Sequence, residues 1–197
     1  MGIDTRERIL QAGSKAMIAK SYNGCGLKEI LEAAEVPKGS FYHYFKSKED
    51  FGVAVLEQMA EVHAERMREL LGDRSKPALE RIRTLFEWLA DWYHEHGATR
   101  AECLVSKMAL EVGQLSEPMR NAIKYAYDRW TALLARAIRD AQTEGSVSPS
   151  LDAEATAKFV LNAWEGATIR MQMEGGFESL DVFLEFVFSQ ILTPRDG

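Results

Sequence analysis

A short run of aromatic, hydroxyl and basic side chains is the part of the sequence best suited to contacting nucleic acid. Residues 38–45 read Lys-Gly-Ser-Phe-Tyr-His-Tyr-Phe, with two tyrosines, two phenylalanines and a histidine. A helix that only fills a core more often uses Leu, Ile and Ala. Ammonium, hydroxyl and imidazole groups can instead bond to phosphates and base edges. We therefore expect this segment to be a helix that binds nucleic acid rather than an aromatic core helix.

A single cysteine in the second half of the chain is the next candidate for chemistry. Cys103 falls in the first turn of a predicted helix, where backbone N–H groups and the helix dipole stabilise a thiolate. Arg100 and Lys107 would favour the thiolate further, and Glu102 would oppose it. A thiolate attacks quinones, enals and maleimides, and peroxide or hypochlorite oxidises it to a sulfenic acid. The alternative is an inert cysteine that fills space, as most unpaired cysteines do.

Helices must position these residues, because the sequence predicts an all-α protein. No segment shows sustained alternation with period two, and five prolines lie between segments of helical periodicity. The pattern predicts an N-terminal head of three helices and a body of six. The expected ranges are 5–20, 27–34 and 38–45 for the head, and 48–71, 77–96, 102–113, 116–144, 152–174 and 179–192 for the body.

Several helix ends are also predicted from residue type. Asp4, Ser47 and Asp152 are expected N-caps, with Glu7 completing a capping box after Asp4. Gly97 is expected to end the helix that begins at Pro77, because glycine is favoured just past a helix C-terminus.

Length and composition exclude several classes of protein. The chain has 197 residues, enough for a core without disulfides or metals. Its longest stretch without a charge is nine residues, too short to span a membrane, and its charged N-terminus is unlike a secretion signal. Two cysteines and no Cys/His cluster predict neither a disulfide framework nor a zinc site. We expect a soluble, cytoplasmic protein with no metal or other cofactor.

Charge is distributed unevenly along the chain. The net charge is −6, yet residues 1–48 hold eight Lys and Arg against five Asp and Glu, a local charge of +3. The remaining residues carry 16 basic against 25 acidic side chains, or −9. A basic head on an acidic body suits a protein that meets phosphate at one end only, although a local +3 is a modest excess.

Two short helices joined by a tight turn are typical of a helix-turn-helix. The first, 27–34, would cross the DNA backbone, and the second, 38–45, would enter the major groove. Phe41 and Phe45 are four residues apart and are expected to face inward as anchors. The expected DNA-binding residues are Lys28, Lys38, Gly39, Ser40, Tyr42, His43, Tyr44 and Lys48.

The segment Val36–Glu49, together with 9–12 and 27–30, resembles the TetR family of bacterial transcriptional repressors. The resemblance covers about residues 5–56. It implies a DNA-binding domain over 1–47 and an effector-sensing and dimerisation domain over 48–197. It also implies a homodimer that binds a palindromic double-stranded operator. One departure is Gly26, where the family often has a threonine that touches a phosphate, so no side-chain contact is expected there.

The last two helices usually form the dimer interface in this family. Here they carry small residues that would allow close approach, and the final helix is apolar on more than one face. A buried C-terminal helix in a monomer is the alternative. The small residues are Ala153, Ala157, Ala163, Gly166 and Ala167.

The body resembles one branch of that family, the repressors of N-ethylmaleimide reductase. The resemblance rests on Cys103-Leu104-Val105, Glu111-Val112 and Leu115-Ser116-Glu117, with Trp164 continuing the match. Members of this branch respond to electrophiles and oxidants through a cysteine at this place, which implies a sensing role for Cys103. Gln172 stands where related repressors place a lysine that can partner the cysteine. Oxidant sensing is therefore expected to differ, while alkylation remains open.

A noncovalent inducer is the alternative within the same class of protein. Aromatic residues with a few polar tips make a good small-molecule cavity, although each of them alone is better explained as core. The residues expected to sense an effector by either route are Cys103, Lys107, Trp88, Trp92, Met108, Tyr125, Trp164 and Gln172.

Two other classes compete with a repressor. An enzyme could use Cys103 as nucleophile with His94 or His96, but no third member or oxyanion motif is recognisable. A helical interaction module would need no DNA, and a steep salt dependence of operator binding would distinguish a repressor from it. We therefore predict a DNA-binding repressor and not an enzyme.

Overall fold

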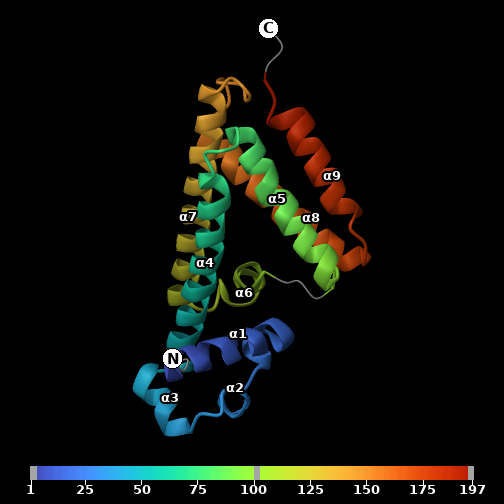
Figure 1. Cartoon of the computed structure of the whole chain (residues 1–197). Coiled ribbons are helices and arrows are strands. Elements are labelled where there is room, and N and C mark those ends of the chain that lie inside the picture. The colour runs from blue at the N-terminus through green and yellow to red at the C-terminus, as the bar shows by residue number, and fades with distance from the viewer. Residues whose placement is uncertain (1–3, 100–102, 195–197) are drawn as a thin grey trace. The chain divides into compact units, whose positions relative to one another are not determined.

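The computed structural model describes residues 4–99 and 103–194, and within these ranges the chain is helical with no strand. The all-α prediction is therefore confirmed. The elements are α1 (Thr5–Gly24), α2 (Leu27–Ala33), α3 (Lys38–Tyr44), α4 (Lys48–Gly72), α5 (Ala78–His96), α6 (Leu104–Val112), α7 (Glu117–Thr143), α8 (Ala153–Glu174), α9 (Glu178–Phe186) and the π-helical turn η1 (Val187–Ile191) (Figure 1).

Most of the predicted helix ends are confirmed. The Asp152 carboxylate accepts from the Ala155 N–H at 2.7 Å, and the Ser47 hydroxyl accepts from the Asp50 N–H at 3.0 Å. Gly97 follows α5 with a φ of 92°. Asp4 stands at the N-cap position of α1, but its side chain makes no cap hydrogen bond. The capping box is wrong, because the Glu7 carboxylate accepts from the Gln11 and Gln58 side chains instead of the first turn.

Three helices, α1, α6 and α9, have an end that differs from the prediction by more than one residue. α1 continues past residue 20 to Gly24, across a kink at Ser21. α6 begins at Leu104, so Cys103 is its N-cap rather than a residue of its first turn. The last helix changes to π-helical geometry at Val187, before its predicted end. The expected start of α6 at residue 102 lies outside the described residues.

The chain divides into two compact units. One comprises Met1–Val62 and Glu102–Tyr127, and the other His63–Ala101 and Asp128–Gly197. Helices α4 and α7 each contribute residues to both. The predicted functional boundary between residues 47 and 48 concerns DNA binding and sensing, and it stays a prediction. Among the described residues, no helix is long and apolar enough to cross a membrane.

The first unit is built around α1, which packs against α2, α3 and α6 (Figure 1). Its aromatic core contains Phe41, Phe45 and Phe51, with neighbouring ring centres 5.0 to 5.5 Å apart. Gly13 of α1 lies against this cluster, and a Cβ there would come within 2.1 Å of the Phe51 ring. Glycine at position 13 therefore lets α1 approach α4 closely.

The second unit contains another aromatic core. The Trp164 ring of α8 lies 5.5 Å from Phe86 of α5 and 5.2 Å from Phe183 of α9, and Tyr93 is 6.1 Å away. Arg81 is also buried and donates to the Leu71 carbonyl. The ring contacts pack α5, α8 and α9 together, and the Arg81 hydrogen bond joins α5 to the end of α4.

Candidate nucleic-acid interface and sensor segment

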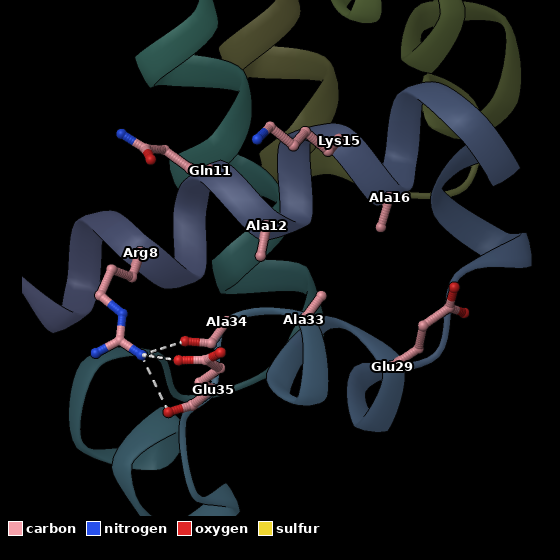
Figure 2. Close-up of a pocket in the computed structure, with 9 residues that line it drawn as sticks. All are labelled: Arg8, Gln11, Ala12, Lys15, Ala16, Glu29, Ala33, Ala34 and Glu35. Atoms are coloured by element: carbon pink, nitrogen blue, oxygen red, sulfur yellow. Dashed lines mark hydrogen bonds and ion pairs between the residues drawn. The ribbon is translucent and has the colours of Figure 1, made fainter.

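The turn between α2 and α3 is held by Arg8 of α1. Its guanidinium donates to the carbonyl oxygens of Ala34 and Glu35 and lies 3.9 Å from the Glu35 carboxylate (Figure 2). Glu35 has a φ of 54°, in the left-handed region that non-glycine residues rarely adopt. Arg8 therefore stabilises an unfavourable turn conformation. Sequence reasoning missed this role, because the partners lie 26 and 27 residues away.

A groove of about 450 Å³ runs beside this contact, between α1 and α2 (Figure 2). Ala12 and Ala16 of α1 line it together with Ala33 at the end of α2 and the C-cap residue Ala34. These small side chains leave the groove open, while α1 and α2 are in contact elsewhere.

Two phenylalanines anchor α3 to the rest of the unit. Phe41 and Phe45 are both buried, and their rings lie 5.3 Å apart. Phe51, at the start of α4, closes the cluster from the other side. The inward direction predicted for Phe41 and Phe45 is confirmed, and it decides which face of α3 points outward.

The outward face of α3 carries polar side chains. Lys38, Gly39, Tyr42 and His43 are exposed, whereas Ser40 and Tyr44 are half-buried. Tyr44 lies against His43, with ring centres 4.9 Å apart. On α2, Lys28 is exposed, 3.7 Å from Glu32. Six of the eight predicted DNA-binding residues thus lie on α3.

Lys48, another predicted DNA-binding residue, has partners within the protein. Its ammonium donates to the carbonyl oxygens of Tyr22 at 2.6 Å and Cys25 at 2.7 Å, and it lies 4.5 Å from the centre of the Tyr22 ring. Lys48 therefore holds the loop that follows α1. A phosphate contact by Lys48 stays a prediction.

Ser21 interrupts α1 near its C-terminal end. Its φ of 61° and ψ of 170° fall in a region used almost only by glycine, at a cost on the order of 1–3 kcal/mol. Dihedrals of this kind open the i to i+4 hydrogen bonds that span the residue. The bond between the Ile18 carbonyl and the Tyr22 N–H is one of these. The kink therefore removes helical partners from backbone groups on both sides of it.

Two side chains of α6 bond to those backbone groups. The Glu111 carboxylate accepts from the Tyr22 N–H at 2.8 Å and from the Asn23 N–H at 2.6 Å. The Lys107 ammonium donates to the Ile18 carbonyl at 2.8 Å. We call Lys107 and Glu111 the α6 brace. Sequence reasoning missed it, because a Lys and a Glu four residues apart predict an ion pair along one helix.

The two cysteines lie in different surroundings. Cys103 is half-exposed at the N-cap of α6, and its carbonyl accepts from the Lys107 N–H at 3.0 Å. Cys25 is buried, and its thiol lies 3.4 Å from the Tyr22 carbonyl oxygen. Burial raises the pKa of the Cys25 thiol, against a smaller lowering by Lys48. Cys103 is thus the more accessible of the two. Arg100 and Glu102, expected to tune it, lie outside the described residues.

The predicted sensing residues are divided between the units. Cys103, Lys107 and Met108 share α6, and Tyr125 lies on α7 in the same unit with 64% of its surface exposed. The other four belong to the second unit. There Trp92 stacks on His96 at 4.2 Å, Trp88 lies 4.5 Å from the Arg66 guanidinium, Trp164 is in the aromatic core, and Gln172 is half-buried. Lys107 and Met108 follow Cys103 along one helix, α6, and Trp88 and Trp92 lie one turn apart on α5.

A groove of about 420 Å³ lies along α8 and α9 in the second unit. Ala163, Gly166 and Ala167 line it, whereas Ala153 and Ala157, also predicted to allow close approach, are buried within the chain. Large apolar side chains remain exposed on these two helices. They are Phe159, Ile169, Met173, Val182 and Phe186.

Comparison with known proteins agrees with this architecture. Residues 9–55 match the family described as bacterial regulatory proteins, tetR family, and residues 78–187 match the tetracyclin repressor-like C-terminal domain. The chain is 36% identical over 191 residues to the HTH-type transcriptional repressor NemR of Escherichia coli strain K12, covering 97% of this chain and 96% of NemR. It is 31% identical to the HTH-type transcriptional repressor DhaR of Mycobacterium sp. strain GP1, covering 98% and 94%.

Solved structures give the same result. The crystal structure of the reduced form of E. coli NemR has a TM-score of 0.91 and 35% identity, covering 99% of this chain and 100% of that one. The resemblance predicted from the motifs is thereby confirmed. The matched relatives are transcriptional regulators, which confirms that the chain is not an enzyme. The chain belongs to the TetR family, as a helix-turn-helix transcriptional repressor.

Proposed function

We propose that this repressor binds a palindromic operator as a homodimer and is released when a reactive electrophile or oxidant modifies Cys103. The observation that carries the DNA-binding part is the exposed polar face of α3, backed by buried Phe41 and Phe45. Lys38 supplies a charge for phosphate, and Tyr42 and His43 supply groups for base edges. Gly39 has no Cβ, so its backbone can come close to the DNA. Nothing in the protein covers this position, because no atom lies within 4 Å of a Cβ placed there.

The groove along α8 and α9 supports dimerisation. Its small residues allow a helix to approach, and the exposed Phe159, Val182 and Phe186 border it. Large exposed apolar patches of this kind mark interaction sites in soluble proteins. A second copy of the same surface would bury them about a two-fold axis, which a palindromic operator requires. Such a repressor works where its operator is, in the bacterial cytoplasm.

Cys103 supports the sensing part through its place in the fold. It is half-exposed at a helix N-terminus, where a thiolate is stabilised. Its sulfur would form a C–S bond with the β-carbon of an enal, quinone or maleimide, whose α-carbon then takes up a proton. Hypochlorite would oxidise the thiol to a sulfenic acid and be reduced to chloride. The related NemR has been solved in a form described as reduced, which supports redox chemistry in this group.

The test measures DNA release by anisotropy with a labelled duplex from the protein's own promoter. N-ethylmaleimide, a quinone or hypochlorite is added to the wild type, Cys103→Ser and Cys25→Ser. We expect the wild type and Cys25→Ser to release DNA and Cys103→Ser to stay bound. If Cys103→Ser releases DNA like the wild type, or the wild type stays bound, sensing through Cys103 is rejected.

The alternative is the same type of repressor induced by noncovalent binding of a small hydrophobic or aromatic molecule in the helical body. Release would then be reversed by dialysis, and Cys103→Ser would respond like the wild type. Half-buried Trp88 and buried Trp164, both in the second unit, supply apolar surface for such a ligand. Reversible release of Cys103→Ser by an unreactive aromatic compound would favour this alternative.

A further inference from the structure

We infer that Lys107 and Glu111 of α6 are positioning residues for operator binding: they hold the kinked end of α1 in the geometry that places the helix-turn-helix. The inference rests on the proposed binding of DNA through α3. Neither residue belongs to α2 or α3, so both act through α1.

The first step is the match between the α6 brace and the opened helical bonds. A kink at Ser21 separates the Ile18 carbonyl from the Tyr22 N–H. The Lys107 ammonium donates to the Ile18 carbonyl. The Glu111 carboxylate accepts from the Tyr22 N–H and from the N–H of the next residue, Asn23. Each charged group thus meets the backbone group of opposite polarity. Lys107 and Glu111 lie one helical turn apart, so one face of α6 supplies both.

The second step leads from the kink to the helix-turn-helix. Only Cys25 and Gly26 separate α1 from α2. The Cys25 N–H donates to the Ser21 carbonyl at 3.2 Å, and the Gly26 carbonyl accepts the first bond of α2, from the Ile30 N–H at 3.2 Å. The conformation of Ser21 therefore decides where α2 begins. Arg8 fixes the other end of α2, so the two ends are positioned independently.

The third step is the strain at Ser21. A serine with these dihedrals persists only where its surroundings hold it there. Without the brace, Ser21 would relax to an ordinary conformation and shift the start of α2. Specific binding, which needs α3 at one angle in the groove, would then suffer more than nonspecific attraction to phosphate.

The experiment compares Glu111→Gln with Lys107→Met, which change the charge in opposite directions. Long-range electrostatics predicts that losing an acid strengthens DNA binding and losing a base weakens it. The brace predicts that both weaken it. For a duplex selected by the wild type from a random library, we expect each variant to raise Kd about tenfold, or about 1.4 kcal/mol. The Kd for a scrambled duplex should change less than threefold, and the slope of log Kd against log salt should be unchanged.

Three controls separate positioning from loss of structure. Glu57→Gln removes an exposed acid from α4 and should not weaken binding. Ser21→Gly relieves the strain, because glycine adopts this conformation readily, and it should restore part of the affinity lost in Glu111→Gln. Ser21→Ala keeps the Cβ and should restore none. Amide exchange at Tyr22 and Asn23 should be faster in Glu111→Gln, with a thermal midpoint close to that of the wild type.

The outcomes discriminate between the two proposals. If the wild type selects no duplex, the proposed function fails. If it does and both variants bind as tightly as the wild type, only the brace is rejected. A loss in Lys107→Met alone, with a smaller salt slope, would make Lys107 a phosphate contact and also reject it. If Glu111→Gln does not fold, Lys107→Met and its rescue by Ser21→Gly decide the question.

Discussion

The exposed face of α3 and the exposed face of α8 and α9 offer opposite chemistry to a partner. Lys38, Tyr42 and His43 present charge, hydroxyl and imidazole, whereas Met173 and Phe186 are 82% and 54% exposed and apolar. Binding at the first face should weaken steeply with salt, because counterions are released from DNA. Association at the second should depend little on salt, because it buries apolar surface. The two proposed interfaces can thus be separated by salt alone.

The largest expected effect is on the apolar face. Phe186→Glu places a carboxylate at the proposed dimer interface, where burial of an unpaired charge is strongly unfavourable. We expect the protein to become monomeric at micromolar concentration, as measured by sedimentation equilibrium. Operator affinity should fall by about 100-fold, because one head alone contacts half the site. Leu115→Glu adds the same charge at an exposed position of the other unit and should leave the dimer intact. If the Phe186→Glu protein is still a dimer, the dimer interface lies on another surface.

A smaller effect is expected on the polar face. Lys38→Ala should weaken binding to all duplexes and reduce the salt slope by about 1, as expected for one lost phosphate contact. Lys48→Ala should reduce that slope by less and lower the thermal midpoint more, because the Lys48 ammonium bonds to the Tyr22 and Cys25 carbonyls. Equal slope changes in the two variants would show that Lys48 also contacts phosphate. Dimerisation should be unaffected in both.

The smallest expected effect is a loss of folding stability at alkaline pH, and it arises from one tyrosine of the first unit. Burial, followed by Glu49, Cys25 and Glu111, raises the pKa of Tyr22 to about 12. The unfolded chain ionises this tyrosine near its ordinary pKa of about 10, while the folded chain keeps it neutral. The contribution of neutral Tyr22 to the free energy of unfolding is therefore complete below about pH 10, and it is lost as the pH rises toward about 12.

Urea unfolding of the wild type and Tyr22→Phe checks this sign. The stability of the wild type relative to Tyr22→Phe should decline between about pH 10 and about pH 12. A constant difference over this range would mean that Tyr22 titrates alike in both states. Tyr22 does not lie on the proposed dimer surface of α8 and α9. The wild type and Tyr22→Phe should therefore have the same dimer dissociation constant.

The predicted sensing residues show how much of a site residue type alone can predict. The sequence identified Cys103 as a candidate, and it lies at the N-cap of α6, because the helix begins at Leu104 and not at residue 102. The other residues expected to sense an effector have different surroundings. Lys107 bonds to the Ile18 carbonyl, Trp164 packs in a core, and Tyr125 is exposed. Periodicity distinguishes buried from exposed positions along a helix, but it does not say which other helix covers them.

Features that depend on neighbours a few residues away could be predicted from the sequence. Asp152, Ser47 and Gly97 mark helix ends because caps act within one turn, and the spacing of Phe41 and Phe45 orients α3. The positions of α2 and α3 along the chain follow from the same short-range rules.

Contacts that join distant segments could not be predicted, because they form only when the helices pack together. Arg8 reaches Glu35 across 27 residues, and Glu111 reaches the Tyr22 N–H across 89. Both support residues with a positive φ, Glu35 directly and Ser21 through the turn that follows it. No local pattern specifies such partners, because they depend on which helices pack together. The exposure of Cys103 and the burial of Trp164 are decided in the same way.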